Sequence, residues 1–154
     1  MAAGIAVLDV LKSEKVIENA AARGEQVLSA LSAMIPRYEL LKGVRGKGLM
    51  IGVEFGPPKS LTLKASWNLL ETASKGLFCQ LITIPLFKEH KILSQVSGHA
   101  SHTIKLIPSL TINNDDCKWI ETAFDSVIAS SHKVPGAIWS LGKTLVDNAV
   151  RKSA

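Results

Sequence analysis

The chain has 154 residues, of which 47% are hydrophobic and 20% are charged, and this composition is typical of one globular domain. Its formal net charge is +5, but the basic residues are scattered and aromatic residues make up only 5%, which argues against a nucleic-acid-binding surface. The apolar runs are too short to span a membrane, which takes about 20 residues, and the first residues lack the basic segment of a signal peptide.

Cysteine usage predicts a cytoplasmic protein. Cys79 and Cys117 lie in unrelated contexts, which suits a reducing compartment with both thiols buried as small apolar groups. Cys79 lies in an apolar segment, where burial raises the pKa of a thiol, so we expect it to be unreactive.

Residues 1–35 predict one long helix that ends before Pro36, since a proline disfavours helical geometry in the residue before it. From Lys15 onward, apolar residues recur at the spacing of one helix face. The first eleven residues, MAAGIAVLDVL, are instead apolar all round the helix, as in a segment that is buried on every side. An apolar chain terminus of this kind indicates that a partner chain or more of the same protein surrounds it.

Strands and helices then follow one another along the chain. Residues 38–42 predict a connector or edge strand, and the alternation in 49–55 predicts a strand. A helix is expected from Leu63 to Gly76. The apolar, β-branched residues 77–84 predict a second strand.

After a loop over 86–101, residues 103–110 predict a third strand. Asn113 begins the clearest helix, because Asp115 and Asp116 favour the positive end of its dipole. A last amphipathic helix is predicted over 137–151. The order predicts an α+β sandwich, with helices on a small and mostly antiparallel sheet.

Glycines and a lysine in VRGKGLMIGVEF are reminiscent of a phosphate-binding loop. Such a loop lies between a strand and the start of a helix, whereas Gly43, Gly46 and Gly48 precede a strand. We therefore interpret them as allowing a bulged strand entry and a close backbone approach, with Lys47 as a solvated surface lysine.

Three histidines, His90, His99 and His102, cluster in the predicted loop, and zinc accepts three histidine ligands. The cluster lacks the close ligand pairing of most metal sites, and the serines beside it do not form a nucleophile motif. Local patterns therefore predict no metal site and no catalytic residue in this chain.

Three segments, in this order and spacing, resemble the C-terminal part of the class-III pyridoxal-phosphate aminotransferases: AAGIAVLDVLKSEKVIENAAARGEQVLSAL, VRGKGLMIGVEF and HTIKLIPSLTINNDD. That family includes acetylornithine, ornithine, 4-aminobutyrate and putrescine aminotransferases, of fold type I. The resemblance implies an interdomain helix over 1–35, the small C-terminal domain over 36–131 and a helical extension over 132–154.

The resemblance also implies that the chain is a fragment of a transaminase, which moves an amino group between an amino acid or amine and a 2-oxo acid. In the family, the Schiff-base lysine and most cofactor contacts lie in a larger upstream domain. We therefore expect pyridoxal phosphate in the parent enzyme, but neither the cofactor nor catalysis in the isolated chain. The implied partners are the missing large domain and a second subunit, because the family forms dimers.

One substrate-binding residue is implied. The family has a carboxylate-binding arginine in the strand before its Pro-Pro-Leu, and this sequence has Lys105 there, with Ser109 in place of the second proline. Lysine offers a point charge where arginine offers a planar fork, so the alternative for Lys105 is a lysine whose charge reaches solvent at a strand edge. The alternative for the whole chain is a self-contained α+β module that binds a small ligand or regulates a partner.

Overall fold

The structure is a computed structural model that describes residues 2–99 and 101–133, so the helix predicted over 137–151 lies outside the described residues. Its elements are α1 (Ala2–Ser13), α2 (Val16–Ser32), β1 (Leu41–Lys47), β2 (Met50–Phe55), α3 (Leu61–Ala73), α4 (Leu77–Lys88), β3 (Gln95–Val96), β4 (Thr103–Leu106) and α5 (Asn114–His132). The strands form an antiparallel sheet in the order β1-β2-β4-β3, which confirms the predicted α+β fold.

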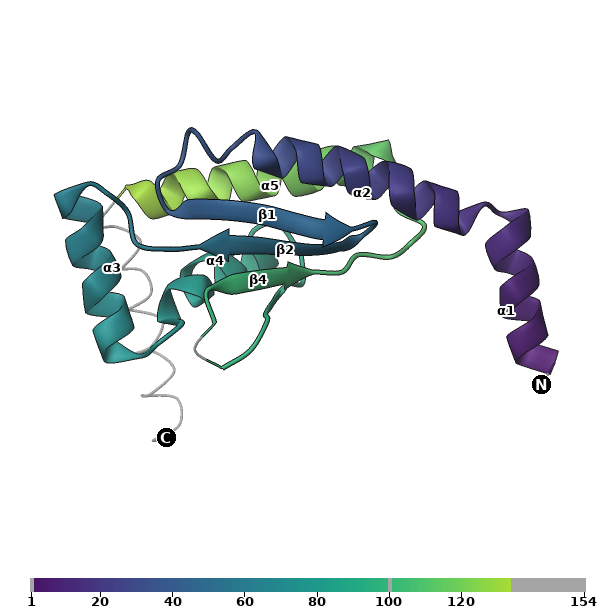
Figure 1. Cartoon of the computed structure of the whole chain (residues 1–154), viewed down its shortest axis with the longest axis horizontal. Helices are drawn as coiled ribbons and strands as arrows, with labels where there is room; N and C mark the ends of the chain where they lie inside the picture. Colours follow the sequence, from purple (N-terminus) through teal and green to yellow (C-terminus); the bar gives the residue numbers. More distant parts are fainter. Residues whose placement is uncertain (1, 100, 134–154) are drawn as a thin grey trace.

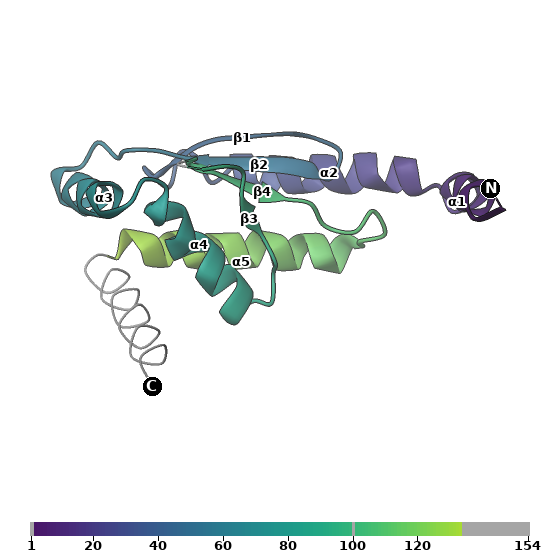
Figure 2. The same ribbon diagram turned by 90° about the horizontal axis from the view of Figure 1, so that it is seen from below.

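The helices are unevenly distributed around this sheet (Figures 1 and 2). Helices α4 and α5 lie on one face, α2 runs along the β1 side, and α3 lies at one end. No described helix covers the opposite face. We call this face, formed by alternate residues of each strand, the outer face.

The predicted single N-terminal helix is wrong, because the chain turns sharply between α1 and α2. Lys15 adopts a left-handed conformation with φ 51°, which interrupts the regular helix between Ser13 and Val16. Only α2 then packs on the domain, through Val27 and Leu31. Within the structure, α1 has no buried residue, and the exposed fractions of Ile5, Val7, Leu8 and Val10 are between 46% and 59%.

The glycine-rich segment forms most of a complete strand rather than only a strand entry. β1 and β2 make a hairpin that turns at Gly48, whose φ is 53°, and the pairing shifts by one residue between Leu41 and Gly43. A Cβ atom on Gly24 of α2 would lie 2.2 Å from the carbonyl oxygen of Gly48. The close backbone approach is thus confirmed, and so is the bulge.

The strand predicted over 77–84 is wrong, because this segment is helix α4. Its apolar residues are compatible with either a buried strand or a buried helix, and only their packing in the fold decides between these two structures. In α4, Phe78, Cys79, Ile82 and Leu86 are buried at helical spacing. Pro85 lies inside the last turn of α4 instead of ending a strand.

The later elements follow the prediction more closely. The loop over 86–101 contains the last residues of α4 and the two-residue edge strand β3, and β4 ends at Leu106 rather than at Leu110. Helix α5 begins after Asn113, whose side chain accepts from the backbone amides of Asp115 and Asp116 in a capping box. Its apolar stripe, which includes Phe124 and Ile128, fills the core beneath the sheet, as predicted.

No helix in the described part of the chain is long and apolar enough to cross a membrane.

Candidate functional site

The outer face carries a row of residues that the strand register aligns. Arg45 of β1 pairs with Gly52 of β2, Gly52 pairs with Lys105 of β4, and Lys105 pairs with Gln95 of β3. Residues directly opposite one another in adjacent strands point to the same face of a sheet. Ile104 and Leu106, which flank Lys105, are buried on the core side, so the side chain of Lys105 points outward.

Lys105 occupies an interior strand of the sheet and is half-buried. Over residues 2–99 and 101–133, no acidic side chain forms an ion pair with it. This residue is the one site residue that the resemblance implies, and its ammonium group is available to an anion that approaches the outer face.

Arg45 and Glu54 form an ion pair on the same face, with 2.5 Å between Arg45 Nη1 and Glu54 Oε2. Both side chains are substantially exposed, so the pair adds at most about 1 kcal/mol to the free energy of unfolding. Sequence reasoning missed both residues. The alternation in β2 could have placed Glu54 on this face, but placing Arg45 beside it required the hairpin register.

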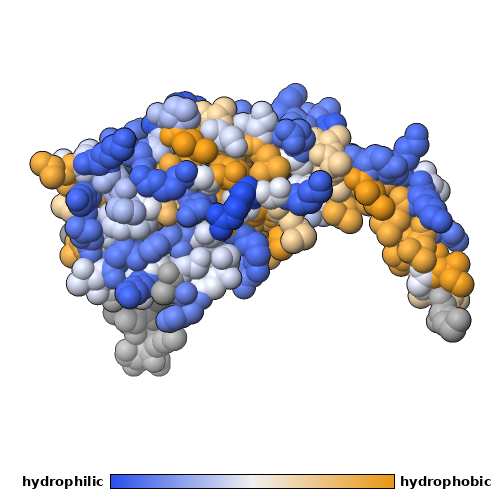
Figure 3. Space-filling view, in the orientation of Figure 1, coloured by the Kyte–Doolittle hydropathy of each residue, from blue (hydrophilic) through white to orange (hydrophobic). Residues whose placement is uncertain are grey.

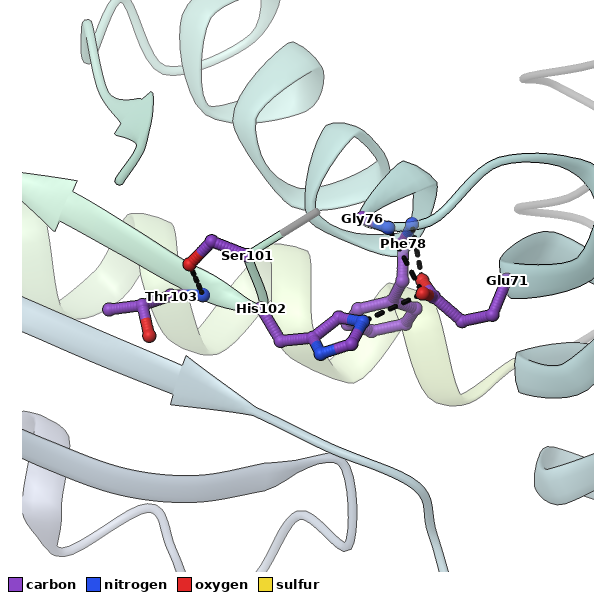
Figure 4. Close-up of polar contacts among 6 residues, drawn as sticks. All are labelled: Glu71, Gly76, Phe78, Ser101, His102 and Thr103. Carbon is purple, nitrogen blue, oxygen red and sulfur yellow. Dashed lines mark hydrogen bonds and ion pairs between the residues drawn. The ribbon is translucent and has the colours of Figure 1, made fainter. Parts of the chain in front are cut away.

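A second polar cluster joins the start of α4 to the start of β4 (Figure 4). Glu71 accepts hydrogen bonds from the Gly76 amide at 3.0 Å and from His102 Nε2 at 2.7 Å, and the Phe78 amide lies 3.5 Å from its other oxygen. Burial alone would raise the pKa of Glu71, but these donors outweigh it and hold the pKa below its usual value. The carboxylate thus caps the first turn of α4, and the ring of His102 packs at a tilt against that of Trp67, with centroids 5.1 Å apart.

The other histidines have separate surroundings. His90 packs against Trp119, with ring centroids 5.9 Å apart, and the Trp119 indole donates to the backbone oxygen of His90. His99 is exposed, and among the described residues no three histidine, cysteine or acidic side chains gather as metal ligands.

Both cysteines are buried, as the sequence predicts. Burial and the nearby charge of Glu71 raise the pKa of Cys79 to about 12, and burial also raises the pKa of Cys117. These thiols are therefore not activated nucleophiles.

Two grooves lie near the α1–α2 junction, away from the Lys105 row. One has a volume of about 650 Å³ and is lined by Lys15, Asn19, Arg23 and residues 110–114. Asn19 donates to the backbone oxygens of Leu110 and Ile112, which fixes this segment against α2. The other groove, about 450 Å³, is apolar and lies against α1, where apolar residues gather along one side of the helix (Figure 3).

Comparison with known proteins gives a consistent result. The model of the family "Aminotransferase class-III" matches residues 1–128. The chain is 30% identical over 123 residues to alanine–glyoxylate aminotransferase 2 homolog 2, mitochondrial, of Arabidopsis thaliana, covering 80% of this chain and 24% of that protein. It is 26% identical over 137 residues to the diaminobutyrate–2-oxoglutarate aminotransferase of Haemophilus influenzae, covering 87% of this chain and 28% of that protein.

The fold is likewise shared with a solved transaminase. An amine transaminase from an uncultivated Pseudomonas species, in the PLP-bound internal aldimine form, superposes with a TM-score of 0.65 at 28% identity, covering 84% of this chain and 27% of that one. The chain thus spans about a quarter of the length of the relatives it matches. The family match over residues 1–128 shows that the chain belongs to the class-III aminotransferases.

Proposed function

We propose that this chain acts as the small domain of a pyridoxal-phosphate-dependent transaminase, and that it binds the carboxylate of the amino-acid or 2-oxo-acid substrate through Lys105. The observation that carries the proposal is the family match, together with the outward direction of Lys105 from the centre of the sheet. Both relatives described above are aminotransferases, which supports the reaction class.

The described residues do not fit a complete pyridoxal-phosphate site. A lysine that forms a Schiff base is usually desolvated so that its pKa falls and its amine is neutral. Among the lysines that the structure describes, Lys105 is half-buried and all the others are exposed. We therefore propose that a separate large domain, in the same protein or in another chain, holds the cofactor and supplies the chemistry.

The surface of α1 supports a large partner of this kind. Ile5, Val7, Leu8 and Val10 are all exposed in the structure, and the apolar groove lies beside them. Contiguous apolar surface of this kind is usually covered by another protein surface. We further propose that the large domain covers this apolar surface, that the protein forms homodimers and that it is located in the cytoplasm.

Cofactor trapping tests the first part of the proposal. The purified chain is incubated with pyridoxal phosphate and reduced with borohydride, and the intact mass and the modified residues are measured. We expect little adduct, spread over many exposed lysines. One stoichiometric adduct at a single lysine would refute the proposal that a separate large domain holds the cofactor, and it would favour a self-contained ligand-binding module.

A chimera tests the reaction. Residues 1–128 replace the matching segment of the Haemophilus influenzae relative, and transamination is measured with the substrates of that enzyme. We expect measurable turnover, and we expect Lys105→Gln to raise KM for the carboxylate substrate about fivefold or more, with a smaller change in kcat. A folded chimera that binds the cofactor but shows no transamination would contradict the proposal.

A further inference from the structure

Two cations flank a glycine at the centre of the outer face. Arg45 and Lys105 lie on either side of Gly52 in the aligned row, two strand spacings or about 10 Å apart at the backbone. Gly52 has no side chain to fill the space between them. The extended side chains of Arg45 and Lys105 are long enough to reach a small group that sits above Gly52.

The backbone does not require glycine at this position. The φ angle of Gly52 lies outside the left-handed region, unlike that of Gly48 at the turn. A Cβ atom on Gly52 would lie 3.4 Å from the Thr103 methyl group and 3.9 Å from Arg45 Cγ, which are ordinary contacts. Backbone strain therefore does not explain the glycine, and the atoms nearest to the missing side chain belong to Thr103 and to Arg45 itself.

The charges on either side of Gly52 favour an anion. Arg45 contacts Glu54 through Nη1, and within the described chain no other acidic group pairs with it, so the remaining guanidinium donors are available. Lys105 adds a second cation, which has no acidic partner among the residues that the structure describes. Arg45, Lys105 and Glu54 together carry one net positive charge, which one carboxylate group would neutralise.

We propose that Arg45 and Lys105 jointly bind one carboxylate group above Gly52, while Glu54 orients the guanidinium of Arg45. Arg45 supplies the planar, two-pronged contact that a lysine at position 105 cannot give, and Lys105 supplies a second charge from the opposite side. This inference rests on the proposed function, and it makes Arg45 a second residue that determines specificity for carboxylate substrates.

The test measures carboxylate binding to the full chain without the cofactor. Two-dimensional amide NMR spectra follow a titration with sodium acetate and a second one with sodium succinate, each compared with sodium chloride at equal ionic strength. We expect saturable shifts at the amides of Arg45, Gly52 and Lys105 with both carboxylates. The same spectra report whether each variant remains folded.

Four variants separate the contributions. Arg45→Gln and Lys105→Gln are each expected to weaken binding about threefold or more, since each removes one charge-assisted contact. Gly52→Val keeps every charge and introduces a residue that favours strands, but its side chain would stand between Arg45 and Lys105, so it should abolish the saturable shifts. Lys64→Gln, an exposed lysine on α3, removes one charge at a distance and should bind as the wild type does.

The outcomes distinguish this inference from the proposed function. If Lys105→Gln weakens binding while Arg45→Gln and Gly52→Val do not, the joint site is refuted and Lys105 keeps its proposed role. Absence of saturable shifts in the folded wild type would also refute the joint site. An inactive chimera with intact carboxylate binding in this assay would instead refute the proposed transaminase role and leave the joint site standing.

Discussion

Gly24→Ala is expected to destabilise the domain, although it replaces a glycine in the middle of a helix. The added methyl group would lie 2.2 Å from the carbonyl oxygen of Gly48, 2.3 Å from its carbonyl carbon and 2.6 Å from its Cα atom. All three are backbone atoms of a tight turn, so the clash cannot be relieved by a side-chain rotation. Helix α2 and the β1–β2 hairpin must move apart, which loosens the packing of Val27 and Leu31.

The magnitude follows from two opposing effects. Alanine is favoured over glycine inside a helix by about 1 kcal/mol. Overpacking a rigid contact costs about 1–3 kcal/mol and occasionally more, and a backbone-to-backbone contact should lie at the upper end of that range. We expect a net loss of about 2 kcal/mol in the free energy of unfolding, which for a chain of this size lowers the Tm by about 4–8 °C.

Circular dichroism during thermal and urea unfolding measures this change, and Gly4→Ala is the matched control. Gly4 also lies in a helix, but a Cβ atom there would meet no heavy atom of the described residues within 4 Å. The control should therefore raise helix content without lowering the Tm. A Gly24→Ala protein as stable as the wild type would refute the close approach of α2 to the hairpin turn.

The remaining predictions concern the second polar cluster, the α5 cap and the thiols. Glu71→Gln should lower the free energy of unfolding at pH 7 by about 1–2 kcal/mol, because it weakens charge-assisted bonds to His102 and the α4 amides. The pKa of Glu71 is depressed in the folded chain, so this stabilisation is present above the ordinary value of 4.5 and is lost as the pH falls below it. The urea midpoint should therefore change less between pH 3 and 7 in the variant than in the wild type. An equal change of the midpoint with pH in both proteins would contradict the prediction. Asn113→Ala should cost about 1 kcal/mol through loss of the capping box, whereas Asn114→Ala, one residue inside the helix, should cost much less in the same urea assay. Equal costs for the two variants would count against the cap. Cys79 and Cys117 should resist iodoacetamide at pH 8 in the native chain and react in urea, as measured by intact mass. Rapid stoichiometric labelling of the native protein would mean that the thiols are more accessible than the structure shows.

Lys105 and Arg45 differ in how the sequence reveals them. Lys105 could be named from the sequence, because it stands within a segment that resembles a known family. Arg45 stands in a glycine-rich segment that we interpreted from the sequence as a strand entry. In that segment only Lys47 was considered as a ligand, for phosphate. The pairing of Arg45 with Gly52 across the hairpin, and of Gly52 with Lys105, makes it a candidate for substrate binding.

Local signals determined several parts of this protein. Helix α5 could be predicted from a cap and an apolar stripe within 20 consecutive residues, and β2 from the alternation of its side chains. Both patterns reflect the repeat of a single helix or strand, so they can be recognised without knowing the rest of the fold. The raised pKa of Cys79 was likewise predicted from its apolar sequence segment, whereas that of Cys117, which follows Asp115 and Asp116, comes mainly from burial in the fold.

Only the tertiary structure decided the rest. Residues 77–88 are apolar enough for either a buried strand or a buried helix, and packing against α5 with the Glu71 cap selects the helix. The left-handed turn at Lys15 has no local signal, and it separates a packed α2 from an unpacked α1. The Arg45–Gly52–Lys105 row spans 60 residues of sequence and depends on the register of three strands, which is fixed by burying one face of the whole sheet rather than by any single segment.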